Sequence, residues 1–159
     1  MSRARVLIIA GALLVLGAVN YSIYAKERIK RDGVVVYLDL APVDPRSIMQ
    51  GDFMALRFRL AQEIQAQVKP LPQEGETGMA DLAIDGRKVA TLAKAGAQGN
   101  LRIHYRIRKG QVWLGTNAFF FEEGSEERFA PARYGEFRVD AASGEAVLVG
   151  LNDASFKPL

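Results

Sequence analysis

The chain has 159 residues, of which 49% are hydrophobic and 25% charged, a composition typical of a folded globular protein and not of a disordered one. It has no cysteine and a single histidine, His104, which excludes disulfides, thiolate metal sites and an all-histidine metal site within one chain. Of the 21 basic residues, two precede the first apolar segment, and the rest of the chain has 19 basic and 18 acidic residues. This part is almost neutral, whereas phosphate binding needs clustered excess positive charge, so we expect no nucleic-acid partner. Nothing in the sequence predicts a cofactor or a bound metal.

The first predicted element is an apolar helix. The segment from Val6 to Ala25 has 20 residues without a formal charge, and a hydrocarbon core of about 30 Å takes roughly 20 helical residues to cross. We therefore predict a retained membrane anchor that contacts the bilayer through residues 6–25. A cleaved signal peptide is the alternative, but cleavage after Ala25 would put Ile23 at a position where a small residue is preferred.

The orientation of this helix follows from two opposing considerations. Arg3 and Arg5 precede the span, and four basic residues follow it closely, so a count of basic residues alone slightly favours a cytoplasmic C-terminal domain. Long C-terminal domains, however, translocate largely regardless of charge. We predict a single-pass protein of the cytoplasmic (inner) membrane, with the N-terminus inside and the C-terminal domain in the periplasm or outside.

The chain after the helix is predicted to form one domain. Residues 1–32 are the anchor helix with a charged stalk, Gly33 breaks the helix, and residues 33–159 form one extracytoplasmic β domain. A β-branched run over 34–40 is typical of a buried strand. A proline-containing turn is expected over 41–50.

The alternating pattern continues through the middle of the chain. It predicts a strand over 51–60, a short helical turn over 61–68 and an exposed loop over 69–78. The Asp85-Gly86 dipeptide predicts a hairpin between 79–84 and 88–93.

The last part of the chain is also mostly extended. Residues 101–108 alternate apolar and polar without interruption, which indicates an antiparallel strand with one wet face. A strand over 111–121, one helical turn within 122–133, and a hairpin of 134–139 with 146–151 complete the pattern. We predict a mainly β fold, with one antiparallel β-sandwich or small barrel and short helical turns.

The start of the second predicted strand carries a candidate structural network. Gly51 permits an unusual backbone angle, and Asp52 can accept hydrogen bonds from free amides of the preceding turn. Asp44 and Arg46 would complete a local charged network.

The clearest charge feature is a basic strand face. It could serve as a surface for an anion, a lipid headgroup or an acidic partner. We favour the alternative of a solvated face that also discourages edge pairing. Its members are Arg102, His104, Arg106 and Arg108, with Arg57 and Arg59 as further candidates.

Two further groups of residues have side chains of the types that hydrolases use, but neither has the spacing of a known catalytic or metal-binding motif. The carboxylates at Glu122, Glu123, Glu126 and Glu127 have no calcium-loop spacing, and we interpret them as a solvated loop. Ser47 with Lys88 as a base would make a nucleophilic pair, although a turn hydroxyl is the ordinary role of such a serine.

Two motifs carry a resemblance to a known family. Residues 42–46 read Pro-Val-Asp-Pro-Arg, residues 51–58 read Gly-Asp-Phe-Met-Ala-Leu-Arg-Phe, and residues 119–124 read Phe-Phe-Phe-Glu-Glu-Gly. This pattern resembles the GDYXXLXY family over roughly residues 33–156, with phenylalanine at both tyrosine positions of the signature. The matching residues are Asp44, Pro45, Arg46, Gly51, Asp52, Phe53, Leu56, Phe58, Glu122, Gly124, Glu127 and Arg133.

The resemblance implies a bacterial membrane-anchored protein without an established activity. Such proteins are often encoded beside polytopic membrane proteins, so an accessory or binding module that docks on an integral membrane partner is the leading hypothesis. The start of the strand at 48–52 also resembles that of signal-peptidase-like folds. The alternative is therefore a membrane-bound hydrolase that uses Ser47 or an acidic pair.

Overall fold

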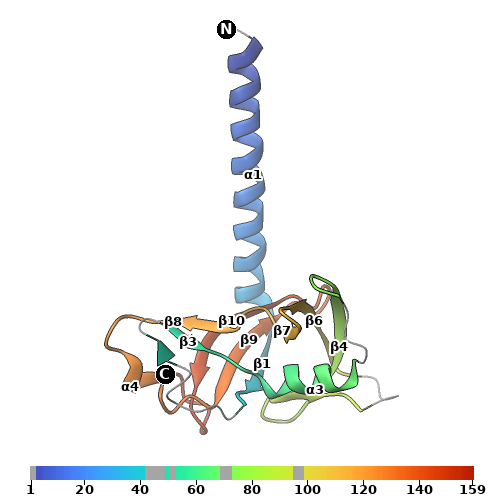
Figure 1. Cartoon of the computed structure of the whole chain (residues 1–159), viewed down its shortest axis with the longest axis vertical. Helices are drawn as coiled ribbons and strands as arrows, with labels where there is room; N and C mark the ends of the chain where they lie inside the picture. Colours follow the sequence, from blue (N-terminus) through green and yellow to red (C-terminus); the bar gives the residue numbers. More distant parts are fainter. Residues whose placement is uncertain (1–2, 42–48, 51–52, 69–72, 95–98) are drawn as a thin grey trace.

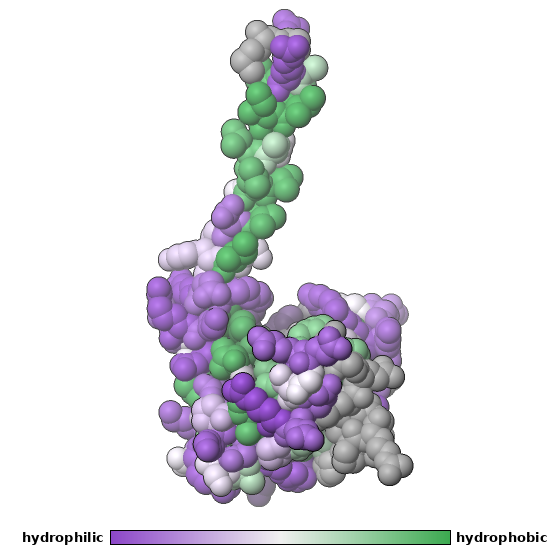
Figure 2. All heavy atoms as spheres, turned by 90° about the vertical axis from the view of Figure 1, so that its left-hand side faces the viewer, coloured by the Kyte–Doolittle hydropathy of each residue, from purple (hydrophilic) through white to green (hydrophobic). Residues whose placement is uncertain are grey.

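A long helix projects from a strand-rich domain in the computed structural model, which describes residues 3–41, 49–50, 53–68, 73–94 and 99–159 (Figure 1). The helix, α1, spans Arg3–Asp32, and Ile29 is its one buried residue. It is long and apolar enough to cross a membrane, and none of its most apolar stretch is buried against the domain. Figure 2 shows this apolar column ending in a band of hydrophilic residues where it meets the domain.

Helix α1 ends at Gly33 because the chain passes close to the domain there. The Gly33 amide donates to the Ile29 carbonyl at 2.8 Å. A Cβ atom at Gly33 would lie 2.5 Å from that same carbonyl oxygen and 3.1 Å from the Cβ of Arg138. The absence of a side chain therefore lets the helix lead directly into the first strand.

The strands of the described residues form three antiparallel sheets. Sheet one has the order β1-β9-β10 and consists of Val34–Asp39, Tyr134–Val139 and Ala146–Asn152. Sheet two has the order β5-β4-β6-β7 and consists of Ala90–Leu92, Thr77–Ile84, Leu101–Arg108 and Gln111–Trp113. Sheet three has the order β2-β3-β8 and consists of Met49–Gln50, Phe53–Ala55 and Ala118–Phe120. Two short helices, α3 and α4, span Arg59–Gln67 and Glu126–Phe129.

Sheets one and two curve around a common core as a half-barrel. On one side the Tyr37 amide donates to the Lys88 carbonyl at 2.8 Å, which joins β1 to the β4–β5 hairpin. On the other side the His104 amide donates to the Gly144 carbonyl at 2.8 Å, which joins β6 to the turn between β9 and β10. These links confirm the prediction of a mainly β antiparallel domain.

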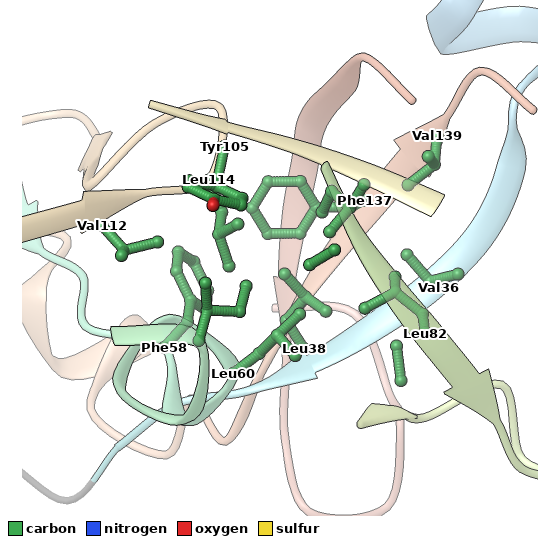
Figure 3. Close-up of a cluster of buried hydrophobic side chains, with 14 of the residues drawn as sticks. Val36, Leu38, Phe58, Leu60, Leu82, Tyr105, Val112, Leu114, Phe137 and Val139 are labelled. Carbon is green, nitrogen blue, oxygen red and sulfur yellow. The ribbon is translucent and has the colours of Figure 1, made fainter. Parts of the chain in front are cut away.

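The core is apolar and is closed at one end by α3 (Figure 3). The rings of Phe58 and Phe137 meet edge to face with centroids 5.2 Å apart, and both residues are fully buried. Leu60 and Ile64, one helical turn apart, present the buried face of α3, which packs against β7, β5 and β1. This i, i+4 spacing explains why α3 lies across the end of the half-barrel.

Most predicted elements are confirmed. The strand over 101–108 has the predicted bounds, with Leu101, Ile103, Tyr105 and Ile107 buried. The hairpin of β4 with β5, the hairpin of β9 with β10, the helical segment after 60 and the helical turn after 125 are all present.

Two predicted strands are wrong in their extent. Among the described residues of the strand predicted over 51–60, Phe53–Ala55 pair as β3 and Phe58 forms an isolated bridge with Leu40. Helix α3 then begins at Arg59, because the buried positions change from a spacing of two to the helical spacing of Leu60 and Ile64. The strand predicted over 111–121 is interrupted between β7 and β8. Gly115 lies there with a φ of 69°, and a Cβ atom on it would lie 2.8 Å from the Ala146 carbonyl oxygen.

Candidate functional site

A basic hollow opens between the foot of α1, which packs against β9 and β10 of sheet one, and strands β6 and β7 of sheet two. We call it the foot hollow, and its volume is about 170 Å³. It is lined by Lys26, His104, Arg106, Arg108, Trp113, Gly115, Glu145 and Ala146. It therefore brings together side chains from the helix, from β6 and β7, and from the start of β10.

Strand β6 supplies three of these residues, because its buried and outward-facing side chains alternate without interruption. The odd-numbered residues point into the core, so His104, Arg106 and Arg108 share the opposite face. In the β6–β7 pairing Arg106 lies directly opposite Trp113. The guanidinium carbon of Arg108 lies 5.4 Å from the centre of the Trp113 ring, within the range of a cation–π interaction.

The helix contributes Lys26, whose Nζ lies 2.9 Å from Glu145 Oε2. Both side chains are about half exposed, at 50% and 47%. The hollow thus holds the cationic side chains of Lys26, Arg106 and Arg108 and one carboxylate, that of Glu145, a formal excess of two positive charges. The excess creates a positive potential over a concave surface that is partly walled by protein.

Trp113 forms part of the wall of the hollow. Its indole Nε1 is buried and has no hydrogen-bond partner among the residues that the structure describes. A buried donor without an acceptor is uncommon and costs free energy.

The other predicted members of the basic face lie elsewhere. Arg102 is on the same face of β6 but pairs across the ladder with Asp81 and does not line the foot hollow. Arg59 and Arg133 both approach the half-buried Asp39, each with Nε 3.2 Å from one of its carboxylate oxygens. Arg57 lines a second hollow beside α3. Of the six predicted residues, His104, Arg106 and Arg108 line the foot hollow.

The two motifs of the sequence signature lie side by side. Strands β3 and β8 are adjacent, and their register places Phe53 opposite Phe120. The two rings have centroids 5.9 Å apart. Phe120 is 73% exposed, so this aromatic pair forms an apolar patch on sheet three. Leu56 and Phe58, from the first motif, are buried in the core.

The remaining candidates divide into exposed and structural positions. Glu122 and Glu123, before α4, and Glu127, within it, are exposed, and Gly124 has a φ of 79° in the turn before the helix. Within the described ranges no three residues among histidine, cysteine, aspartate and glutamate gather closely enough to hold a metal ion. Lys88 has a φ of 66° in the β4–β5 turn.

Several predicted residues lie outside the described part of the chain. They are Asp44, Pro45, Arg46, Ser47, Gly51 and Asp52. The turn network and the serine–lysine pair therefore stay predictions.

Sequence reasoning missed Lys26, Trp113 and Glu145 as members of a site. Lys26 is the first charged residue after the apolar segment and Trp113 is the only tryptophan, so both carry some signal in the sequence. Glu145 carries none, because its partner Lys26 is 119 positions away.

Comparison with known proteins gives one match. The family model described as GDYXXLXY protein matches residues 15–151. No curated protein and no solved structure is significantly similar to the chain.

Proposed function

The chain belongs to the GDYXXLXY family, and from this premise we propose that it is a membrane-anchored accessory module. Helix α1 crosses the inner membrane once, with its N-terminus in the cytoplasm. The β domain of residues 33–159 lies in the periplasm or outside, where it docks on an integral membrane protein with several spans.

The exposure of α1 supports the anchor. A 30-residue helix whose most apolar stretch is entirely exposed has no reason to be stable in water, because each large apolar side chain loses roughly 1.5–3 kcal/mol when it is left unburied. Lipid removes that penalty, and the helix satisfies its own backbone hydrogen bonds. Tyr21 and Tyr24 lie near the end of the apolar stretch, where aromatic rings favour the membrane interface.

The patch formed by Phe53 and Phe120 supports docking. Figure 1 places β8 along the edge of the domain from which α1 projects, so this strand is near the proposed membrane surface. An aromatic pair with one exposed ring on a short sheet is typical of a contact surface, and aromatic residues are enriched in protein interfaces. The patch also unites the two signature motifs, although they are far apart in the sequence.

Site-specific photo-crosslinking tests this proposal. A photoreactive phenylalanine analogue replaces Phe120 in the full chain, and membranes from cells that express it at native level are irradiated. We expect an adduct with one integral membrane protein that stays in the membrane after carbonate washing. The analogue at Thr91, an exposed position on β5, should give no such adduct.

The docking proposal is contradicted by adducts with lipid alone at Phe120, or by equal adducts at Phe120 and Thr91. As a second measurement, Phe53→Ser should reduce the yield at Phe120, because it removes half of the aromatic patch while the core stays intact.

A further inference from the structure

We propose that the foot hollow binds the phosphate of an anionic phospholipid headgroup, in the leaflet that the β domain faces. This inference deepens the proposed function and rests on the insertion of α1 in the membrane. The chemistry recognised is a phosphate ester that carries a net negative charge, and the lipid is its proposed source.

The position of the hollow along the chain places it at headgroup level. Lys26 follows directly after Ala25, the last residue of the uncharged segment of 20 residues. At 1.5 Å per residue this segment is about 30 Å long, which matches the hydrocarbon core of a bilayer. The ammonium group of Lys26 must therefore emerge among the headgroups, and the hollow that it lines opens there.

The domain cannot move far from this level because α1 is packed against it. Ile29, one turn after Lys26, is buried at the contact of α1 with β9 and β10. The helix then enters β1 within a few residues, through Gly33. There is thus no flexible linker between the proposed span and the hollow.

The lining suits a phosphate better than a carboxylate-rich or neutral ligand. Arg106 and Arg108 present guanidinium groups, which bind phosphate oxygens through paired, charge-assisted hydrogen bonds. Lys26 adds a third positive charge.

The concentration of positive charge is local. From Lys26 onward the chain has 19 basic and 18 acidic residues, so the foot hollow is a basic site in a nearly neutral domain. A second hollow at the foot of α1 has both signs, with Arg28 beside Asp32 and Asp140. The foot hollow is therefore the stronger anion site of the two at this level.

Trp113 makes the test direct because it is the only tryptophan in the chain. The full chain is reconstituted in phosphatidylcholine vesicles that contain an increasing fraction of phosphatidylglycerol, and tryptophan emission is recorded. We expect a saturable change in emission as the anionic lipid increases.

Matched variants separate the site from general attraction to a charged surface. Arg106→Gln and Arg102→Gln each remove one positive charge from the same exposed face of β6, but only Arg106 lines the hollow. Arg106→Gln should require about tenfold more anionic lipid for half-saturation, since hydrogen bonds to charged groups contribute about that factor or more. Arg102→Gln should titrate like the unchanged chain.

Glu145→Gln should act in the opposite direction. It removes the one carboxylate of the hollow and leaves Lys26 free for the ligand, so half-saturation should occur at a lower fraction of anionic lipid.

Three outcomes overturn the inference. Equal titrations for Arg106→Gln and Arg102→Gln would show that the hollow is not the binding site. The same emission change at low concentrations of soluble glycerol phosphate, in vesicles of phosphatidylcholine alone, would assign the site to a soluble phosphate ester. No change with either ligand would exclude an anion site altogether. Failure of the anchor is seen separately, as extraction of the chain from the vesicles by carbonate.

Discussion

The Nζ atom of Lys26 lies 2.9 Å from Oε2 of Glu145, and this ion pair joins the foot of α1 to the residue that precedes β10, across 119 positions of sequence. Half-exposed pairs contribute only about 0–1 kcal/mol, so the pair is not what fixes the helix to the domain. The burial of Ile29 contributes more, at roughly 1.5–3 kcal/mol. The pair instead sets the shape and charge of the foot hollow.

The topology of the chain can be measured with single cysteines, because the natural sequence has none. Ser155→Cys places a thiol at an exposed position of the β domain. We expect a membrane-impermeant maleimide to label it in intact spheroplasts, since the domain is proposed to lie outside the cytoplasm.

Ser2→Cys is the matched control for topology, because it precedes the apolar segment. It should be labelled only after permeabilisation. The reverse pattern of the two variants would place the β domain in the cytoplasm.

The contact of Phe58 with Phe137 should dominate the stability of the half-barrel. Phe137→Ala should lower the free energy of unfolding by about 3–5 kcal/mol, because it opens a cavity at a fully buried position. Urea denaturation of the detergent-solubilised chain, followed by Trp113 fluorescence, measures this change. Phe120→Ala, at an exposed position, should change it by less than about 1 kcal/mol.

Gly144 should be far less tolerant of a side chain than Gly75. Both have positive φ values, 72° and 87°, so alanine at either position is strained by about 1–2 kcal/mol. At Gly144 a Cβ atom would also lie 2.5 Å from the Cε of Met79 and 3.1 Å from the Arg102 carbonyl oxygen, whereas nothing lies within 4 Å at Gly75.

Thermal unfolding of the two alanine variants tests this difference. Gly144→Ala should lower Tm distinctly more than Gly75→Ala, because it also disturbs the link between β6 and the β9–β10 turn. Equal shifts in Tm would mean that the neighbours of Gly144 move aside freely.

Asp140 should make the β9–β10 turn sensitive to acid. Its Oδ1 accepts the amides of Ser143 and Ala142 at 2.7 and 2.9 Å, and the Ser143 hydroxyl at 3.1 Å. The hydrogen bond from the Ser143 amide lowers the pKa of Asp140 most, and the hydrogen bond from the Ser143 hydroxyl lowers it further. The carboxylate form is therefore stabilised in the folded chain.

The sign of the pH effect follows from a pKa that is lower in the folded state than in the unfolded state. The contribution of Asp140 to the free energy of unfolding is fully present above the ordinary aspartate pKa of about 3.9. It is lost as the pH falls through the lower pKa of the folded state. Asp140→Asn should thus be less stable than the unchanged chain at neutral pH, and the difference should shrink in acid. A difference that does not vary with pH would contradict this role.

The alternation of side chains in the sequence was sufficient to predict several strands. Residues 101–108 alternate strictly between apolar and polar, and that period of two has one structural solution, a strand with one buried face. The turns were predicted less well in detail. The φ above zero in the β4–β5 turn belongs to Lys88 and not to Gly86, because Asp85 holds the amides of Arg87 and Val89 and shifts the turn along the chain.

The sequence by itself determined the apolar helix, the β-rich domain and the family, because hydropathy, alternation and motif spacing are local properties of the chain. Only the tertiary structure decided which basic residues share a surface. In the folded chain Arg106 and Arg108 line one hollow with Lys26 and Trp113, whereas Arg59 pairs with Asp39. Contacts between distant segments depend on how the sheets close around the core.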